Sequence, residues 1–243
     1  MRLHIHPLLE EYYTPKYKFI GFLFKLFPVL DRFFQKFPEK IKNIIYNWNA
    51  YVNERTVEVP FVLLNIGPEK EKILDVGCSR SVLSILMAEQ GHNVWGIDIN
   101  DYGLNDLPFT FIKGDICKTD FQDNFFDCVV AVSTIEHIGI GAYGDSPDEN
   151  KEKLAIKEIF RILKPSGKFI VTLPYGKKSI GKDLRIYDEQ SLNSLLEQFK
   201  IEKIKYYVKK GNAWIECNKE DAKNEEWNEK NRNNAVVLVV ARK

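Results

Sequence analysis

A short apolar segment that ends in an acid and then turns at a glycine constrains the fold of this chain most. The segment covers residues 73–91, ILDVGCSRSVLSILMAEQG, with Asp75 before Gly77 and an apolar, helix-like stretch after it. Glycine permits a tight turn because it adopts backbone angles that other residues avoid. The helix start that follows offers unpaired backbone N–H groups. Strand, turn and helix together predict an α/β domain that binds a ligand at the turn.

Strand and helix patterns alternate from residue 72 onward. Strands are expected in KILDV, NVWGIDI, FTFIKGD, FDCVVAVS and KFIVTLP, with helices over residues 82–90, over 151–163 and after Asp188. The closing segments IEKIKYYV and AVVLVVARK favour two antiparallel strands, with a short helix capped by Asn218 between them. This order predicts a doubly wound, mostly parallel, Rossmann-like sheet of seven strands with helices on both faces.

Residues 1–70 differ and are expected to form an N-terminal helical extension to a domain over residues 71–243. Residues 17–37 are rich in Phe and Leu, and their cations follow helical spacing: Lys18, Lys25, Arg32 and Lys36. Pro28 should interrupt that helix. A cap packed on the sheet domain, a dimer contact and an amphipathic helix on a membrane surface all fit this pattern.

Composition narrows the function classes. A formal net charge of +1 gives no overall field for a polyanion, so no nucleic-acid partner is expected. The four cysteines lack C-x-x-C spacing, which favours a reduced, cytoplasmic setting and no metal site. We find neither a signal peptide nor the run of about 20 apolar residues that spans a membrane. Peripheral contact with the inner membrane face stays open through residues 17–37.

Three acids each close a successive strand: Asp75, Asp98 and Asp115. Because parallel strands bring their carboxyl ends to one edge of a sheet, these acids are expected to lie side by side. Asp98 stands at the position where an acid accepts hydrogen bonds from ribose hydroxyls in dinucleotide-binding folds. A dehydrogenase would need glycines at Ser79 and Val82, so a different nucleotide-like ligand is indicated.

Five segments in order, ILDVGCSRS, GIDIN, KGDI, VVAVSTIEHIG and IFRILKPSGKFIVTLP, resemble the class I S-adenosylmethionine-dependent methyltransferases. Where that family has G-x-G-x-G, this chain has G-x-S-x-S. The resemblance implies S-adenosylmethionine as cofactor. It also implies contacts to the methionine part from Asp75, Gly77, Cys78 and the Ser133 backbone, to ribose from Asp98 and Ile99, and to adenine from Asp115 and Ile116.

The acceptor side is expected after the fourth strand, at STIEHIG. Glu136 and His137 are the catalytic candidates, with His137 as general base; the alternative is that both shape the pocket as part of the family's structural signature. In the loop of residues 139–148, Tyr143 and Asp145 either touch substrate or belong to a solvated connector. Arg185 and Tyr187 enter the same rim, where the arginine binds a carboxylate or phosphate, or pairs with a nearby acid.

The acceptor class is narrowed by what is missing. No D/N-P-P-Y or Pro-Cys follows the fourth strand, which disfavours methylation of nucleic-acid amino groups and pyrimidine rings. The segments ERTVEVPFVLL and RIYDEQSL are similar to methyltransferase-like proteins of bacterial polysaccharide and glycan gene clusters. We therefore expect O-methylation of a small molecule or a sugar-type acceptor. The alternative is a non-catalytic cofactor-binding or scaffold protein with a degenerate glycine loop.

Overall fold

The computed structural model describes residues 53–141, 147–148, 150–226 and 234–243. The chain divides into two compact units, Met1–Val52 and Asn53–Lys243, and the second unit contains everything reported below. The predictions about residues 17–37, Tyr143 and Asp145 lie outside the described residues. The second unit begins before the first strand, so the helix that starts at Arg55 belongs with the sheet.

Within the described residues, an eight-stranded sheet has the order β3-β2-β1-β4-β5-β10-β8-β9. The first five strands in this order are parallel to their neighbours, whereas β10 is antiparallel to both β5 and β8. The strand bounds are β1 Lys72–Val76, β2 Asn93–Asp98, β3 Thr110–Lys113, β4 Phe126–Val132, β5 Leu163–Pro174, β8 Lys200–Lys210, β9 Ala213–Cys217 and β10 Ala235–Arg242. A separate pair, β6 Ser179–Ile180 and β7 Arg185–Ile186, follows β5.

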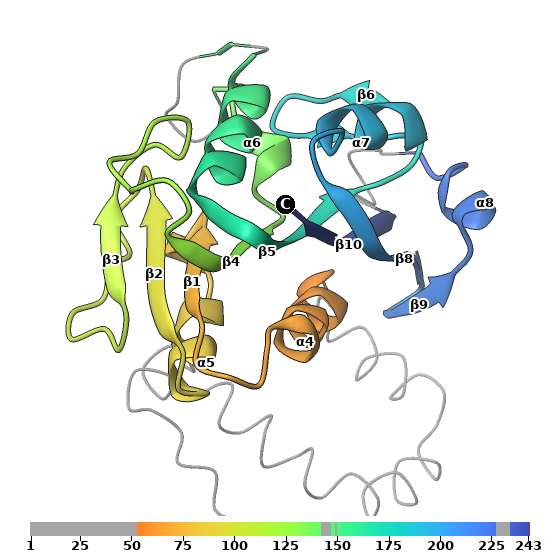
Figure 1. Ribbon diagram of the computed structural model, residues 1–243. Coiled ribbons are helices and arrows are strands. Elements are labelled where there is room, and N and C mark those ends of the chain that lie inside the picture. Colours follow the sequence, from red (N-terminus) through yellow and green to blue (C-terminus); the bar gives the residue numbers. More distant parts are fainter. Residues whose placement is uncertain (1–52, 142–146, 149, 227–233) are drawn as a thin grey trace, which may run out of the picture. The chain divides into compact units, whose positions relative to one another are not determined.

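Helices cover both faces of the sheet, as Figure 1 shows for α4 on one side and α6 and α7 on the other. The helices are α4 Arg55–Asn65, α5 Leu83–Glu89, α6 Lys151–Ile162, α7 Glu189–Leu195 and α8 Lys219–Ala222, with 3-10 turns η1 Cys78–Arg80 and η2 Ile135–His137. β4 and β10 are buried along almost their whole length because both faces are covered. The doubly wound prediction is confirmed, and this topology brings the ends of β1, β2, β3 and β4 to one edge.

Both predicted helix caps are confirmed. The Asp188 side chain accepts the Ser191 N–H at the start of α7, and Asn218 accepts the Asp221 N–H at the start of α8. Such caps are recognisable in a sequence because a short polar side chain replaces the missing partner of a helix N–H group.

Two strand predictions need correction. The sheet has an eighth strand, β9, which pairs with β8 through a turn at Gly211, where φ is +60°. The Gly-Asn pair at this turn is a sequence signal for a hairpin. β5 begins at Leu163, so LKPSG is part of the strand; Leu163 pairs with Phe126, and Lys243 exchanges backbone hydrogen bonds with Ser166 and Gly167.

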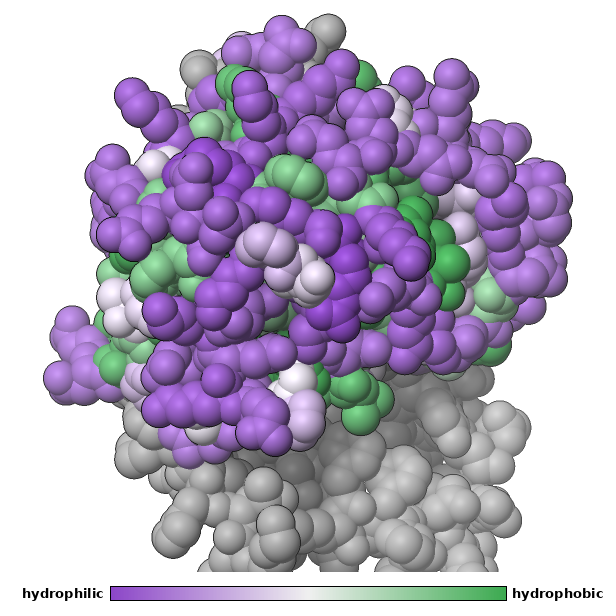
Figure 2. All heavy atoms as spheres, in the orientation of Figure 1, coloured by the Kyte–Doolittle hydropathy of each residue, from purple (hydrophilic) through white to green (hydrophobic). Residues whose placement is uncertain are grey.

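The described surface is mostly hydrophilic in the view of Figure 2, with apolar side chains in scattered places. Among the described residues, the most exposed large apolar side chain is that of Leu64, at 81%. No helix in the described part of the chain is long and apolar enough to cross a membrane.

Candidate functional site

The turn after β1 depends on a glycine. Gly77 has φ +77° and ψ +41°, and its N–H donates to the Ile97 carbonyl at 2.9 Å. A Cβ atom at this position would lie 2.4 Å from side-chain atoms of Thr134, too close for any other residue. The Thr134 hydroxyl in turn donates to the carbonyls of Val76 and Val132, each at 3.1 Å. The ends of β1 and β4 are therefore fastened together at Gly77.

Asp98 closes β2 and supports the same turn. Its two carboxylate oxygens accept the backbone N–H groups of Ser79 at 3.0 Å and Asn100 at 2.8 Å. Each carboxylate oxygen has a second lone pair, so Asp98 can still accept hydrogen bonds from ligand hydroxyls. Ile99, directly after it, is half-buried.

Asp115 lies next to Asp98, because Asp98 pairs with Lys113 across β2 and β3. Partial burial on its own would raise the pKa of Asp115, but the Cys117 N–H and the Lys151 ammonium, 2.9 and 3.6 Å away, outweigh it and lower that pKa. Its side chain is 43% exposed, so an ionised carboxylate faces outward here. Ile116 is instead buried in the core, at 6% exposed.

The structure corrects the prediction that the Asp75 side chain faces the ligand. Asp75 is 2% exposed, and its carboxyl accepts the Ser84 hydroxyl of α5 at 2.6 Å beneath the turn. Burial raises its pKa to about 7. Cys78 is also fully buried, and its sulfur lies against Gly96.

Ser133, at the end of β4, has a left-handed backbone with φ +44°. Its N–H donates to the hydroxyl and carbonyl oxygens of Thr172, at 3.0 and 3.3 Å. Its hydroxyl donates to the Glu58 carboxyl at 2.7 Å. A non-glycine residue in this conformation carries strain that its surroundings must hold, as Thr172 and Glu58 do here.

Helix α4 contributes residues that sequence reasoning missed. The Arg55 guanidinium donates to the Val132 carbonyl at 2.9 Å and to the Glu58 carboxyl at 3.0 Å. Glu58 is completely buried, and burial raises its pKa. An acid amid the apolar residues of ERTVEVPFVLL was the available signal, because acids are seldom buried without a specific partner.

Glu136 and His137 lie in η2, directly after Ser133 and Thr134. Glu136 is 1% exposed, burial raises its pKa well above the usual range, and its Oε2 atom has no hydrogen-bond partner among the described residues. The His137 Nδ1 atom forms a short contact with the Asp183 carbonyl, and Nε2 lies 3.9 Å from Glu136 Oε1. Burial is the main cause that lowers the His137 pKa. A neutral imidazole therefore adjoins a buried carboxyl.

Arg185 and Tyr187 do not face a substrate as predicted. Both are buried, and Arg185 donates to the Ile138 carbonyl at 2.6 Å and lies 3.7 Å from the Glu152 carboxylate. The Tyr187 hydroxyl donates to Glu152 at 2.7 Å. The alternative prediction for Arg185, pairing with an acid, is the arrangement found. The two side chains hold η2 against α6.

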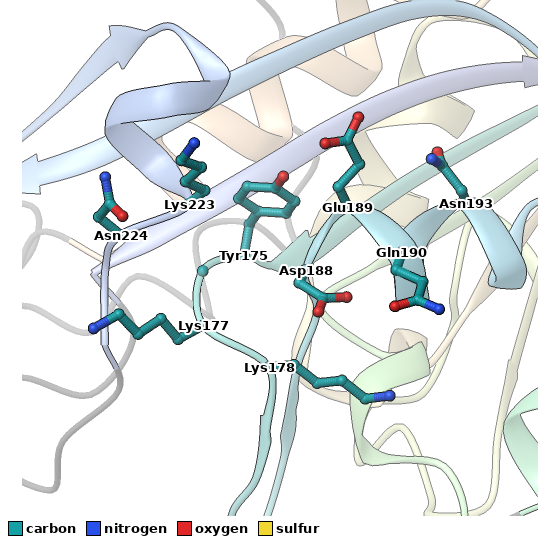
Figure 3. A pocket seen from close by; sticks show the side chains of 10 residues that line it. Tyr175, Lys177, Lys178, Asp188, Glu189, Gln190, Asn193, Lys223 and Asn224 are labelled. Carbon is teal, nitrogen blue, oxygen red and sulfur yellow. The ribbon is translucent and has the colours of Figure 1, made fainter.

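A separate groove of about 810 Å³ opens where β5 ends, at Tyr175 and Gly176 (Figure 3). In that view the Tyr175 ring lies between Lys223 of the α8 segment and Glu189 of α7, while Lys177 and Lys178 point away from each other. Its other polar lining includes three amide side chains, Gln190, Asn193 and Asn224. This groove offers many hydrogen-bond donors and acceptors beside the carboxyl end of β5.

Comparison with known proteins finds similarity to methyltransferases. Residues 74–171 match the family model described as a methyltransferase domain. The sterol 24-C-methyltransferase of Yarrowia lipolytica is 34% identical over 113 residues, which cover 40% of this chain and 26% of that protein. The chain thus spans about a quarter of the length of such curated relatives.

Two solved structures show the same fold. One is a SAM-dependent methyltransferase from Methanosarcina mazei, with a TM-score of 0.54, 21% identity and coverage of 76% of this chain and 97% of the other. The second is the Burkholderia thailandensis 1,6-didemethyltoxoflavin-N1-methyltransferase with bound 1,6-didemethyltoxoflavin and S-adenosylhomocysteine. Its TM-score is 0.54, with 15% identity and coverage of 84% of this chain and 85% of the other.

Proposed function

We propose that this chain contains a class I S-adenosylmethionine-dependent methyltransferase domain and that the protein methylates a small-molecule acceptor. The observation that carries the proposal is the pairing of two ligand-accessible acids, Asp98 and Asp115, at adjacent strand ends beside the Gly77 turn. Sequence similarity to a methyltransferase domain over residues 74–171 supports the same conclusion.

The residues at this edge fit the cofactor. The spare lone pairs of Asp98 suit two vicinal ribose hydroxyls, and the exposed carboxylate of Asp115 suits an amino group of a purine. Residues 77–79 and Ser133 would lie along the methionine part through their backbone groups. Asp75 has a different role in this arrangement, because its carboxyl holds α5 beneath the turn.

S-adenosylmethionine, when bound, supplies a methyl group on a positively charged sulfur. The protein must then align the acceptor, exclude water and remove a proton where the acceptor is a hydroxyl. We propose His137 as the base. Its Nδ1–H donates to the Asp183 carbonyl, which leaves the lone pair on Nε2, and burial favours the neutral ring. The proton of the acceptor would move to Nε2, where the nearby Glu136 carboxyl stabilises an imidazolium.

We further propose a polar, hydroxyl-bearing acceptor of the sugar or glycan class, and hence O-methylation. The groove beside the end of β5 supports this, because its amide and lysine side chains match a ligand rich in hydroxyl groups better than a sterol-like hydrocarbon. Thr172 and Val132 are register partners, so β5 ends beside β4 at the edge that carries His137.

The cellular setting is also part of the proposal. We propose a cytoplasmic protein, which the four cysteines support: none forms a disulfide in the described part of the chain, and thiols stay reduced in that compartment. Contact of residues 17–37 with the membrane remains a proposal that rests on the sequence pattern alone.

Isothermal titration of the full chain with S-adenosylmethionine tests the cofactor, and label transfer to a panel of sugars, glycans and sterols tests the acceptor. We expect saturable binding and transfer to a hydroxyl of a saccharide. A folded protein that takes up no cofactor contradicts the methyltransferase proposal. Label found on a sterol carbon or an amine contradicts only the acceptor class.

Removing the proposed base tests the mechanism. His137→Ala should lower turnover by about 100-fold or more, the usual contribution of a positioned base, while cofactor affinity stays unchanged. His92→Ala is the matched control, because His92 lies before β2, at the opposite edge of the sheet. A His137→Ala enzyme with full turnover would leave this residue only a structural role.

A further inference from the structure

The region where β4 ends holds more buried acid than buried base. Glu58, Glu136 and Asp75 are each 2% exposed or less, and Arg55 is the cation whose charge reaches all three of them. Arg55 already donates to Glu58 and to the Val132 carbonyl. Among the described residues, the acids here therefore lack the positive charge that burying carboxylates normally requires.

Glu136 is the buried acid here that most clearly lacks a partner. Its Oε2 atom is buried without a hydrogen-bond partner among the described residues, whereas Glu58 is bonded to both Arg55 and Ser133. A buried polar atom without a partner destabilises the folded protein, and more so when the group is charged. Native proteins contain few such atoms, and each calls for an explanation such as a bound ligand.

The position of Glu136 indicates which ligand would provide the missing charge. Glu136 follows Thr134 by two residues, and Thr134 packs against Gly77 at the turn that faces the cofactor. Ser133, which lies between β4 and η2, donates a hydrogen bond to Glu58. The cofactor of the proposed function carries two positive groups, an ammonium on its methionine part and the sulfonium.

We propose that the Glu136 carboxyl, supported by Glu58 behind Ser133, receives a positively charged group of the bound cofactor, either its ammonium or its sulfonium. This inference rests on the proposed function. The charge of the ligand satisfies the orphan oxygen and replaces the missing cation, so the site is more complementary to the cationic cofactor than to a neutral analogue of it.

A consequence for proton binding follows. Glu136 is protonated more readily than an ordinary glutamate because burial raises its pKa, and an adjacent cation favours the ionised form. Cofactor binding should therefore release protons. Among the described residues, the charged and titratable groups near Glu136 include Glu54, Arg55 and Glu58 at α4, His137 beside it, Tyr187, and Arg185, which donates to its backbone carbonyl.

The test is titration calorimetry on the full chain with three ligands that differ in charge. S-adenosylmethionine has both cationic groups, S-adenosylhomocysteine keeps only the ammonium, and 5′-methylthioadenosine has neither. In Glu136→Gln, affinity for S-adenosylmethionine should fall about tenfold or more, as expected for a lost charge-assisted bond. An equal loss for S-adenosylhomocysteine assigns the ammonium; a loss confined to S-adenosylmethionine assigns the sulfonium. Affinity for 5′-methylthioadenosine should not change.

Repeating the titration in buffers of different ionisation enthalpy measures the number of protons released on binding. Glu136→Gln should release fewer protons than the wild type. Glu58→Gln should weaken the same ligands less, because Glu58 acts through Ser133. Glu202→Gln is the control, since Glu202 pairs with Arg242 on the surface of β8. Thermal unfolding without ligand checks that each variant folds.

The inference is overturned if Glu136→Gln binds all three ligands as the wild type does, or if it weakens all three equally, which indicates a general structural effect. A wild-type protein that binds none of the ligands would instead contradict the proposed function.

Discussion

Two groups of acids at one edge of the sheet have opposite surroundings. The rim carboxylates, Asp98 and Asp115, accept backbone N–H groups and keep part of their surface open to solvent. The inner carboxyls, Asp75, Glu58 and Glu136, are almost completely buried, and burial raises the pKa of each. The Cys117 N–H and the Lys151 ammonium lower the pKa of Asp115, whereas burial favours the neutral acid in the second group.

This difference shows that an acid at a strand end is not a sufficient sign of ligand contact. Asp75 and Asp98 occupy equivalent places in the sequence pattern, yet one holds a helix and the other faces outward. The functional contribution of each acid depends on the donors around it and on its exposure.

The largest expected effect is on how the stability of the fold depends on pH, which should differ between Asp75→Asn and the wild type. The folded-state pKa of Asp75, about 7, exceeds its ordinary value of 3.8, so this group stabilises the fold at low pH and loses that contribution as pH rises from about 4 to about 7. The loss is up to about 1.4 kcal/mol per pH unit, or roughly 4 kcal/mol in total. Asparagine keeps the bond from Ser84 without the charge, so the variant should gain on the wild type across this window.

Urea unfolding at a series of pH values measures this difference. Asp101→Asn is the control, because Asp101 is an exposed acid that pairs with Lys113. If the free energies of unfolding of wild type and Asp75→Asn changed in parallel with pH, burial would not raise the pKa of Asp75 as it does for the other inner carboxyls.

The second effect concerns the turn at Gly77, which packs against Thr134. Gly77→Ala should destabilise the fold by about 3 kcal/mol, part from the left-handed backbone and part from the clash with Thr134. Gly91→Ala is a matched control with φ +94° and open space within 4 Å of the point where an added Cβ would lie, so it carries the backbone cost alone. Equal losses in the two variants, measured by denaturant unfolding, would show that the contact with Thr134 is unimportant.

The third effect is on ligand binding by the rim. Asp98→Ala should weaken S-adenosylmethionine binding by about 2 kcal/mol, because it removes charge-assisted hydrogen bonds, while Asp101→Ala should leave the affinity unchanged. Calorimetry with the purified chain gives both values. Undiminished affinity in Asp98→Ala would refute the placement of the ribose.

Local patterns predicted the sheet, the Gly77 turn and the positions of Asp98 and Asp115, because each depends on residues close together in the chain. The inner carboxyls were harder to predict. The direction of Asp75 is set by Ser84 on the next helix, and Glu58 becomes relevant only through Ser133. Arg185 shows the same limit, since its contacts with Ile138 and Glu152 depend on how β7 packs on η2 and α6.

The contacts from α4 to the end of β4 also have a consequence for how the protein is made. Arg55 and Val132 are 77 residues apart in the chain, and Glu58 and Ser133 are 75 apart. During synthesis α4 leaves the ribosome long before its partners exist, and contacts between distant residues form late because a long loop must close first. We therefore expect the chain to acquire its glycine turn early and to complete its reaction centre among the last steps of folding.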